Sequence, residues 1–293
     1  MRKFFRALKT ILLAPVRLIL WIVRTIRRWA AHIFREVNAF FTEEPEDSPL
    51  PDAFAKTIEN PMGVLEHLDA LRKHLLRATV FLIITTGFAF LYARQVLELL
   101  ARPIGGLENI FAIDPTEPIG VFMKVALLVG FSLALPYIAL ELWLFAAPGL
   151  SRRARLWGLF AIPAVVIFFL GGMLFAYFVM LPTAMPFLLD FLDIQTQVRL
   201  SSYVSFTTGL MFWIGVAFEF PLVIFVLAGM GLIKAHSLAQ QWRLAVVAVA
   251  ILAAAITPTV DPVNMGLVMG PMIALYFLSI GLAYLAQRGR VTS

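Results

Sequence analysis

The feature that most constrains this chain is a series of long apolar runs. A helix that crosses a bilayer needs about 20 mostly apolar residues. Four runs meet this requirement, at residues 76–93, 121–147, 156–181 and 203–233. Two shorter runs follow, at 243–257 and 264–286. The first of these is barely long enough and ends before Pro258, so we interpret it as a span in a locally thinned bilayer.

The composition is typical of a membrane protein. Of the 293 residues, 61% are hydrophobic and 14% are charged, whereas soluble domains are about half apolar and about a quarter charged. The absence of cysteine excludes disulfides and thiolate metal sites. The four histidines lack metal-ligand spacing, so we expect neither a metal nor a cofactor. Nucleic acid is not an expected partner, because an anionic membrane surface accounts for the net charge of +6.

The loops between the runs alternate in charge. The loops of one set are basic and carry Arg72, Lys73, Arg77, Arg152, Arg153, Arg155, Lys234, Arg243, Arg288 and Arg290. The loops of the other set are acidic and carry Glu108, Asp114, Glu117, Asp190, Asp193 and Asp261. Because basic loops stay in the cytoplasm, the pattern predicts an all-α protein with six transmembrane helices and both termini cytoplasmic.

Two further segments precede the membrane domain, which we place at residues 63–293. Residues 1–42 have basic side chains on one helical face and apolar side chains on the other, which predicts an interfacial amphipathic helix. Arg17 and Arg24 leave no uninterrupted apolar core along the segment, which argues against a secretory signal peptide and against a seventh span. Residues 43–62 are acidic and rich in proline, which predicts a flexible linker.

Glu219 stands inside the apolar run at 203–233, two residues before Pro221. An ionisable residue inside a membrane is costly and is a functional candidate by default. The alternative interpretation is an internal hydrogen bond to the hydroxyl of Thr207 or Thr208. Pro221 is expected to bend the helix and to leave a main-chain carbonyl without its usual donor.

Seven motifs, in order along the chain, resemble one family. They are EHLDALRKHL (66–75), AIDPTEPIGVFMKVAL (112–127), ALPYIALELWLFAAPGL (134–150), GGMLFAYFVMLPTAMPFL (171–188), SSYVSFTTGL (201–210), GVAFEFPLVIFVLAGMGLI (215–233) and ITPTVDPVN (256–264). Together they resemble TatC, the multi-spanning core subunit of the twin-arginine (Sec-independent) protein translocase. The resemblance runs from about residue 62 to 286 and leaves the N-terminal segment outside it.

The resemblance implies a fold and a function. It implies six helices in a concave, cup-like arrangement, with the last two helices short. Proteins of this family are not enzymes: they bind twin-arginine signal peptides on the cytoplasmic face and recruit single-span TatA/TatB-type subunits. Folded proteins then cross with the help of the proton-motive force. It also implies a homo- or hetero-oligomer in the cytoplasmic membrane of a prokaryote.

The family uses two cytoplasmic glutamates to hold the arginine pair, and this chain has neither. The matching positions are Ala70 and Ala154. Asp69 is adjacent to the first, although on a helix it points about 100° away. The resemblance also brings Arg72, Phe145 and Pro103 to the signal-peptide region. Glu141, beside Leu140 where the family usually has a Tyr-Gln pair, is a replacement carboxylate or, alternatively, pairs with Arg152 or Arg153 at the interface.

The remaining positions match the family. In the family, the glutamate at the position of Glu219 faces the cavity in mid-membrane and contacts a single-span partner. Lys124 and Asp261 are assigned with it to partner contact and translocation, and Asp114 and Glu117 to the external loop. For these four residues, ordinary loop and helix-start structure is the alternative interpretation.

Two other functions stay open at this point. One is a divergent TatC paralogue that has lost twin-arginine recognition, since Ala70 and Ala154 replace both glutamates. The other is a small-solute or proton transporter that uses Glu219, although the sequence has no repeat between its halves. An intramembrane enzyme is disfavoured, because no catalytic arrangement lies within the runs.

Overall fold

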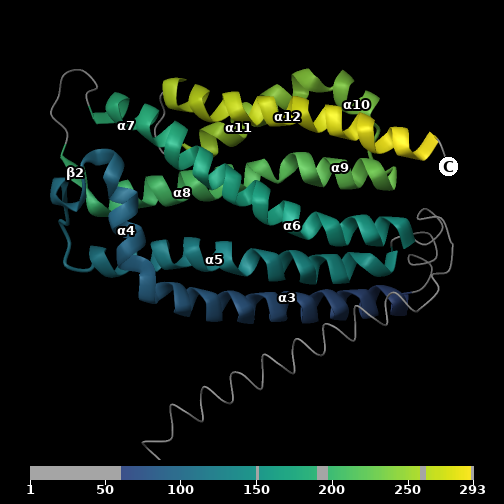
Figure 1. The fold of residues 1–293 in the computed structure, drawn as a ribbon, viewed down its shortest axis with the longest axis horizontal. Helices are drawn as coiled ribbons and strands as arrows, with labels where there is room; N and C mark the ends of the chain where they lie inside the picture. The colour runs from purple at the N-terminus through teal and green to yellow at the C-terminus, as the bar shows by residue number, and fades with distance from the viewer. Residues whose placement is uncertain (1–60, 150–151, 190–196, 258–261, 292–293) are drawn as a thin grey trace, which may run out of the picture. The chain divides into compact units, whose positions relative to one another are not determined.

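The computed structural model describes residues 61–149, 152–189, 197–257 and 262–291 (Figure 1). These residues belong to one compact unit, Leu50–Ser293. The expected N-terminal amphipathic helix lies outside the described residues, as do Asp261 and most of the expected linker. The first described helix begins at Pro61, two residues before the predicted start of the membrane domain.

The described part of the chain is almost entirely helical. Its α-helices are α3 (Pro61–Ala89), α4 (Ala93–Ala101), α5 (Glu117–Ala146), α6 (Arg152–Phe175), α7 (Leu181–Leu189), α8 (Leu200–Phe218), α9 (Phe220–Met230), α10 (Ala235–Gln240), α11 (Trp242–Ile256) and α12 (Pro262–Val291). Shorter helical turns are η1 (Phe90–Tyr92), η2 (Arg102–Ile104), η3 (Leu107–Asn109), η4 (Ala147–Gly149) and the π-helical η5 (Ala176–Met180). Two short strands, β1 (Ile110–Phe111) and β2 (Val198–Arg199), pair in parallel.

Five helical segments of the described chain are long and apolar enough to cross a membrane. They are His67–Ile104, Glu117–Ala146, Ala161–Pro186, Leu200–Gly229 and Met265–Gln287. The predicted class, an all-α membrane protein, is therefore confirmed. The sixth candidate, α11, has 15 residues, or about 22 Å of helix against a core of about 30 Å, so the count of six spans stays a prediction.

The expectation that the last two helices are short was right for α11 and wrong for α12. Helix α12 has 30 residues, as many as α5. It begins at Pro262 and continues beyond the apolar segment, through the polar residues after Ala286. The length of an apolar run therefore underestimates the length of a helix whose last turns lie outside the hydrocarbon core, because polar residues also form helix.

Helix α5 is central to the packing. It lies beside α3 along its length and also contacts α6 and α8, while α9 lies along α12 (Figure 1). Successive long helices run in opposite directions (Figure 1). We call the end where α3 begins and α5 and α9 end the basic end, and the end where α3 finishes and α5 and α8 begin the acidic end.

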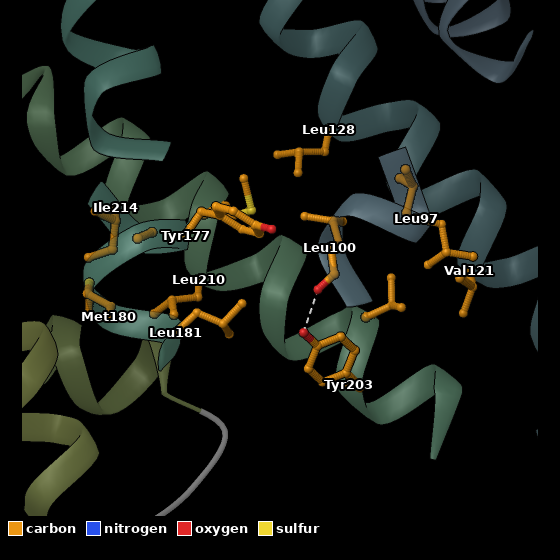
Figure 2. Close-up of a cluster of buried hydrophobic side chains, with 14 of the residues drawn as sticks. Leu97, Leu100, Val121, Leu128, Tyr177, Met180, Leu181, Tyr203, Leu210 and Ile214 are labelled. Carbon is orange, nitrogen blue, oxygen red and sulfur yellow. Dashed lines mark hydrogen bonds between the residues drawn. The ribbon is translucent and has the colours of Figure 1, made fainter. Parts of the chain in front are cut away.

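A buried cluster at the acidic half joins α4, α5, η5 and α8 (Figure 2). Leu97 and Leu100 of α4 enter this cluster from the amphipathic face of that helix. The hydroxyl of Tyr203 donates to the carbonyl of Leu100 at 2.5 Å (Figure 2), and the hydroxyl of Tyr177 donates to the carbonyl of Leu99 at 2.7 Å. These bonds tie η5 and α8 to the last turn of α4, where the carbonyl of Leu99 also accepts the N–H of Arg102.

Candidate functional site

Glu141 is enclosed between α3 and α5 near the basic end. It is 1% exposed. Its Oε2 lies 2.6 Å from Nδ1 of His74 and 3.8 Å from Nη1 of Arg77, and its Oε1 accepts the hydroxyl of Tyr137. A carboxylate can only accept hydrogen bonds, so His74 donates. Helical spacing explains the cluster, because residues three or four apart share a face.

Phe145 extends this cluster by one turn of α5. Its ring lies 4.4 Å from the ring of His67, centroid to centroid, and 6.1 Å from that of His74. His67 and His74 are seven residues apart, which puts them on one face of α3. The aromatic rings therefore continue the α3–α5 contact toward the start of α3, where the signal-peptide region was predicted.

The other residues predicted for this region lie at the surface. Asp69 has 51% of its side chain exposed and pairs with Lys73, one turn on, at 2.6 Å. Arg72 is exposed, and Ala70 is half-buried. Asp69 is thus an accessible carboxylate near the start of α3, whereas Glu141 is an enclosed one. The side chains of Glu66, Arg152, Arg153 and Ala154 lie outside the described structure.

Glu219 lies where the fourth apolar run breaks. Helix α8 ends at Phe218 and α9 begins at Phe220. Pro221 has no N–H to continue the ladder of α8 and lies at the first turn of α9, where a missing donor is harmless. The carbonyl of Glu219 accepts the N–H of Val223 at 3.0 Å. The helix is therefore interrupted at Glu219, beside the proline where a bend was predicted.

The side chain of Glu219 is half-buried. Its Oε1 is buried and has no hydrogen-bond partner within the part of the chain that the structure describes. The bond predicted from Thr208 is wrong, because that hydroxyl donates to the carbonyl of Val204 at 2.6 Å. Eleven residues of helix put about 16 Å between Thr208 and Glu219, and Thr207 is one residue farther.

Two glycines bring α6 against α8 just before this break. A Cβ on Gly172 would lie 2.8 Å from Cα of Gly215, and a Cβ on Gly215 would lie 2.8 Å from the ring of Phe169. Neither position leaves room for a methyl group. The main chain of Phe169 consequently lies beside the carboxyl group of Glu219, so α6 forms one wall of the surroundings of Glu219.

The predicted residues of the acidic end divide into two kinds. Asp114 is exposed. Pro103, which was assigned to the signal-peptide region, instead lies at this opposite end and is half-buried in η2. Glu117 is the first residue of α5 and is buried. Its Oε1 accepts Nε of Arg199 at 2.5 Å, and Nη2 of the same guanidinium contacts it as well. This hydrogen bond raises the pKa of Arg199.

Lys124 is two turns farther along α5. It is exposed, and its Nζ donates to Oγ of Ser205 on α8 at 2.5 Å. Arg199 and Ser205 were not predicted, and no local pattern marks them as partners of residues 82 and 81 positions away. The candidate residues therefore form three separate groups: an enclosed cluster at the basic end, Glu219 at the helix break, and, at the acidic end, the Glu117–Arg199 ion pair with Lys124 bonded to Ser205. The described residues contain no group of side chains suited to a metal ion.

Comparison with known proteins gives consistent results for most of the chain. The family model described as Sec-independent protein translocase protein (TatC) matches residues 66–271. The chain is similar to the Sec-independent protein translocase protein TatC of Deinococcus radiodurans, with 36% identity over 248 residues, 82% of this chain and 91% of that protein. The homologous protein of Koribacter versatilis is 33% identical over 234 residues, covering 77% and 86% respectively.

A solved structure is similar as well. The crystal structure of the twin-arginine translocase receptor TatC superposes with a TM-score of 0.68 and 33% sequence identity. The superposition covers 75% of this chain and 99% of that one. The similarity thus extends over the whole of the relative and over the membrane-spanning part of this chain.

Proposed function

Because the chain belongs to the TatC family, whose members are components of the Sec-independent protein translocase, we propose that it binds twin-arginine signal peptides and recruits single-span TatA/TatB-type subunits to export folded proteins. It acts as the multi-spanning core subunit and assembles as a homo- or hetero-oligomer. The proposal assigns it no catalytic step, no cofactor and no metal.

Partner recruitment is supported by the buried Oε1 of Glu219, which has no hydrogen-bond partner in the described chain. A buried carboxyl oxygen without a hydrogen-bond partner costs free energy, and within a membrane the cost cannot be relieved by bulk water. A polar side chain from a partner helix would supply the missing donor. The position at a helix break adds to this, because the main chain around Pro221 has fewer internal hydrogen bonds than a continuous helix.

Signal-peptide binding is proposed for the basic end. The incoming arginine pair needs a carboxylate, and the family glutamates are replaced by Ala70 and Ala154. Asp69 is the accessible substitute, because its carboxylate is half exposed and pairs with Lys73 on its own helix. Glu141 is already occupied by His74 and Tyr137, so we assign it to holding α3 against α5 beneath Phe145.

The basic end is proposed to face the cytoplasm of a prokaryotic cell. The loops between α5 and α6 and around α10 carry arginine and lysine without acidic residues, and basic loops remain on the cytoplasmic side. Both termini then lie in the cytoplasm, and the β1–β2 end faces outward. Asp114, Glu117 and Pro103 belong to the outward-facing loop, and Asp261 and Lys124 to the translocation side.

One experiment tests both activities. The full chain is produced with its single-span partner subunits in a bacterial strain that lacks its own TatC. Export of a folded reporter with a twin-arginine signal is measured together with photo-crosslinking of the signal peptide. We expect Glu219→Ala to lower export tenfold or more and to leave crosslinking unchanged. We expect Asp69→Ala to lower crosslinking about tenfold, since a contact with a charged group contributes about 1.5–3 kcal/mol.

The matched control is Glu98→Ala. It removes an exposed carboxylate on α4 that pairs only with Arg94 on the same helix, and it should change neither readout. Failure of the unaltered chain to export the reporter, although it accumulates in the membrane, would contradict the translocase proposal. Unchanged export by Glu219→Ala would overturn the role of that glutamate alone.

A further inference from the structure

A groove opens at the acidic end between α7, β2 and α8, next to the end of α11. Its volume is about 730 Å³, within the roughly 300–1,000 Å³ of cavities that hold small molecules. One half of its wall is polar, with Arg199, Ser201, Ser202 and Ser205. The other half is apolar, with Leu188, Phe206 and Trp213. The change from polar to apolar follows α8 from its first turn inward.

Lys124 of α5 lies beside the polar half of the groove. Nζ of Lys124 donates to Oγ of Ser205, a residue of the groove wall. Within the part of the chain that the structure describes, no carboxylate forms an ion pair with Lys124, whereas the neighbouring Arg199 is neutralised by Glu117. The oxygen of Ser205 accepts one of the three N–H donors of the ammonium group. The other two donors of Lys124 can bind an anion.

The position of Lys124 along α5 places it near the level of the lipid headgroups. Helix α5 has 30 residues, or about 45 Å, against a hydrocarbon core of about 30 Å. If the excess is divided equally, about 7 Å projects from the core at each end. Lys124 lies about 10 Å from the start of α5, hence roughly 3 Å inside the core, and its side chain extends far enough to reach the headgroup boundary. Lipid phosphates lie at that level.

We propose that this groove binds an anionic phospholipid of the outward-facing leaflet. The phosphate contacts Lys124 and the hydroxyls of Ser201 and Ser202, and an acyl chain lies along Leu188, Phe206 and Trp213. The apolar half favours a lipid over a free phosphate, because burial of acyl methylenes stabilises only the lipid. The ammonium group of Lys124 favours an anionic headgroup over a zwitterionic one, whose own ammonium offsets the attraction.

The test is lipid binding by the purified full chain in a non-ionic detergent. Phosphatidylglycerol or phosphatidylcholine is added in increasing amounts, and native mass spectrometry measures the fraction of protein that carries each lipid. We expect phosphatidylglycerol to bind more tightly. We expect Lys124→Gln to weaken phosphatidylglycerol about tenfold, Lys124→Arg to retain it, and Ser202→Leu, which fills the mouth of the groove, to weaken both lipids.

Arg94→Gln is the matched control, because it removes an exposed cation of the acidic end that is already paired with Glu98; it should leave binding unchanged. Equal binding of phosphatidylglycerol by Lys124→Gln and the unaltered chain would overturn the proposal. Displacement of the lipid by millimolar glycerol phosphate would overturn it in favour of a free-phosphate site. Displacement by a single-span partner subunit, with no dependence on Lys124, would assign the groove to that subunit instead.

Discussion

Glu141 and Glu219 are two glutamates within apolar helices of one protein, and their surroundings differ in kind. Glu141 is fully buried and accepts hydrogen bonds from His74 and Tyr137, with Arg77 nearby. Glu219 has a buried oxygen with no partner in the described chain, at a break between two helices. The first carboxylate completes an internal network. The second leaves an acceptor that the described fold does not use.

The difference separates stability from function. A buried carboxylate with partners on a neighbouring helix holds the two helices together, and its loss destabilises the fold. A buried carboxyl oxygen without a donor costs stability, so the buried Oε1 of Glu219 is better explained by a group that it binds. Burial alone therefore does not distinguish these two glutamates, whereas the hydrogen-bond partners of their buried oxygens do.

The largest expected effect concerns Glu141→Ala. This substitution removes the acceptor shared by His74, Arg77 and Tyr137, and we expect it to lower the free energy of unfolding by about 3–5 kcal/mol. Glu219→Ala removes a carboxyl group whose buried Oε1 has no partner in the described chain, and should change the free energy of unfolding by less than about 1 kcal/mol. Denaturant unfolding in detergent micelles measures both. If both substitutions lowered the free energy of unfolding equally, the two glutamates would not differ in their contribution to stability.

A middle-sized effect is expected from Gly172→Ala. Its Cβ would lie 2.8 Å from the main chain of α8, so α6 and α8 must separate, at a cost of about 1–3 kcal/mol. Because α6 walls the surroundings of Glu219, export should fall too, although the glutamate is unchanged. Gly171→Ala is the control, since its Cβ meets no atom within 4 Å; it should be neutral or slightly stabilising.

The smallest effect is expected from Tyr203→Phe. It removes one neutral hydrogen bond, to the carbonyl of Leu100, and should cost about 1 kcal/mol. The exposed Tyr284 provides the comparison, because Tyr284→Phe should leave the unfolding free energy unchanged. If Tyr203→Phe lowered the free energy of unfolding as much as Glu141→Ala, a buried charged network would not be worth more than a single neutral hydrogen bond in this protein.

The features that depend on neighbouring residues could be predicted from the sequence. The spans follow from runs of apolar residues, and the break after Phe218 follows from the missing N–H of Pro221. Helix α4 was not predicted, although its pattern was available: Leu97 and Leu100 are buried, while Arg94 and Glu98 are exposed and pair with each other. The predicted span ended at residue 93, so this short amphipathic helix fell in the loop that follows it.

The pairings between distant residues could not be predicted. Asp114 and Glu117 look alike in the sequence, yet one is exposed and the other is buried against Arg199. Only the fold brings that arginine near. The partners of Glu141 could be predicted in part, because helical spacing puts His74 and Arg77 on one face of α3. That this face packs against the face of α5 that carries Glu141 could not be predicted, because it depends on how the helices pack.

The contacts at the acidic end also restrict the order in which the protein can be completed during synthesis. Glu117 and Arg199 are 82 residues apart, and Leu100 and Tyr203 are 103 residues apart. At about 5–20 residues per second, the ribosome takes roughly 4–16 s to produce Arg199 after Glu117. Throughout that interval β1 has no partner strand, and the carboxylate of Glu117 has no guanidinium to pair with. The acidic end is therefore a late-closing part of the molecule, and a chain arrested before β2 and α8 would present β1 as an unpaired edge.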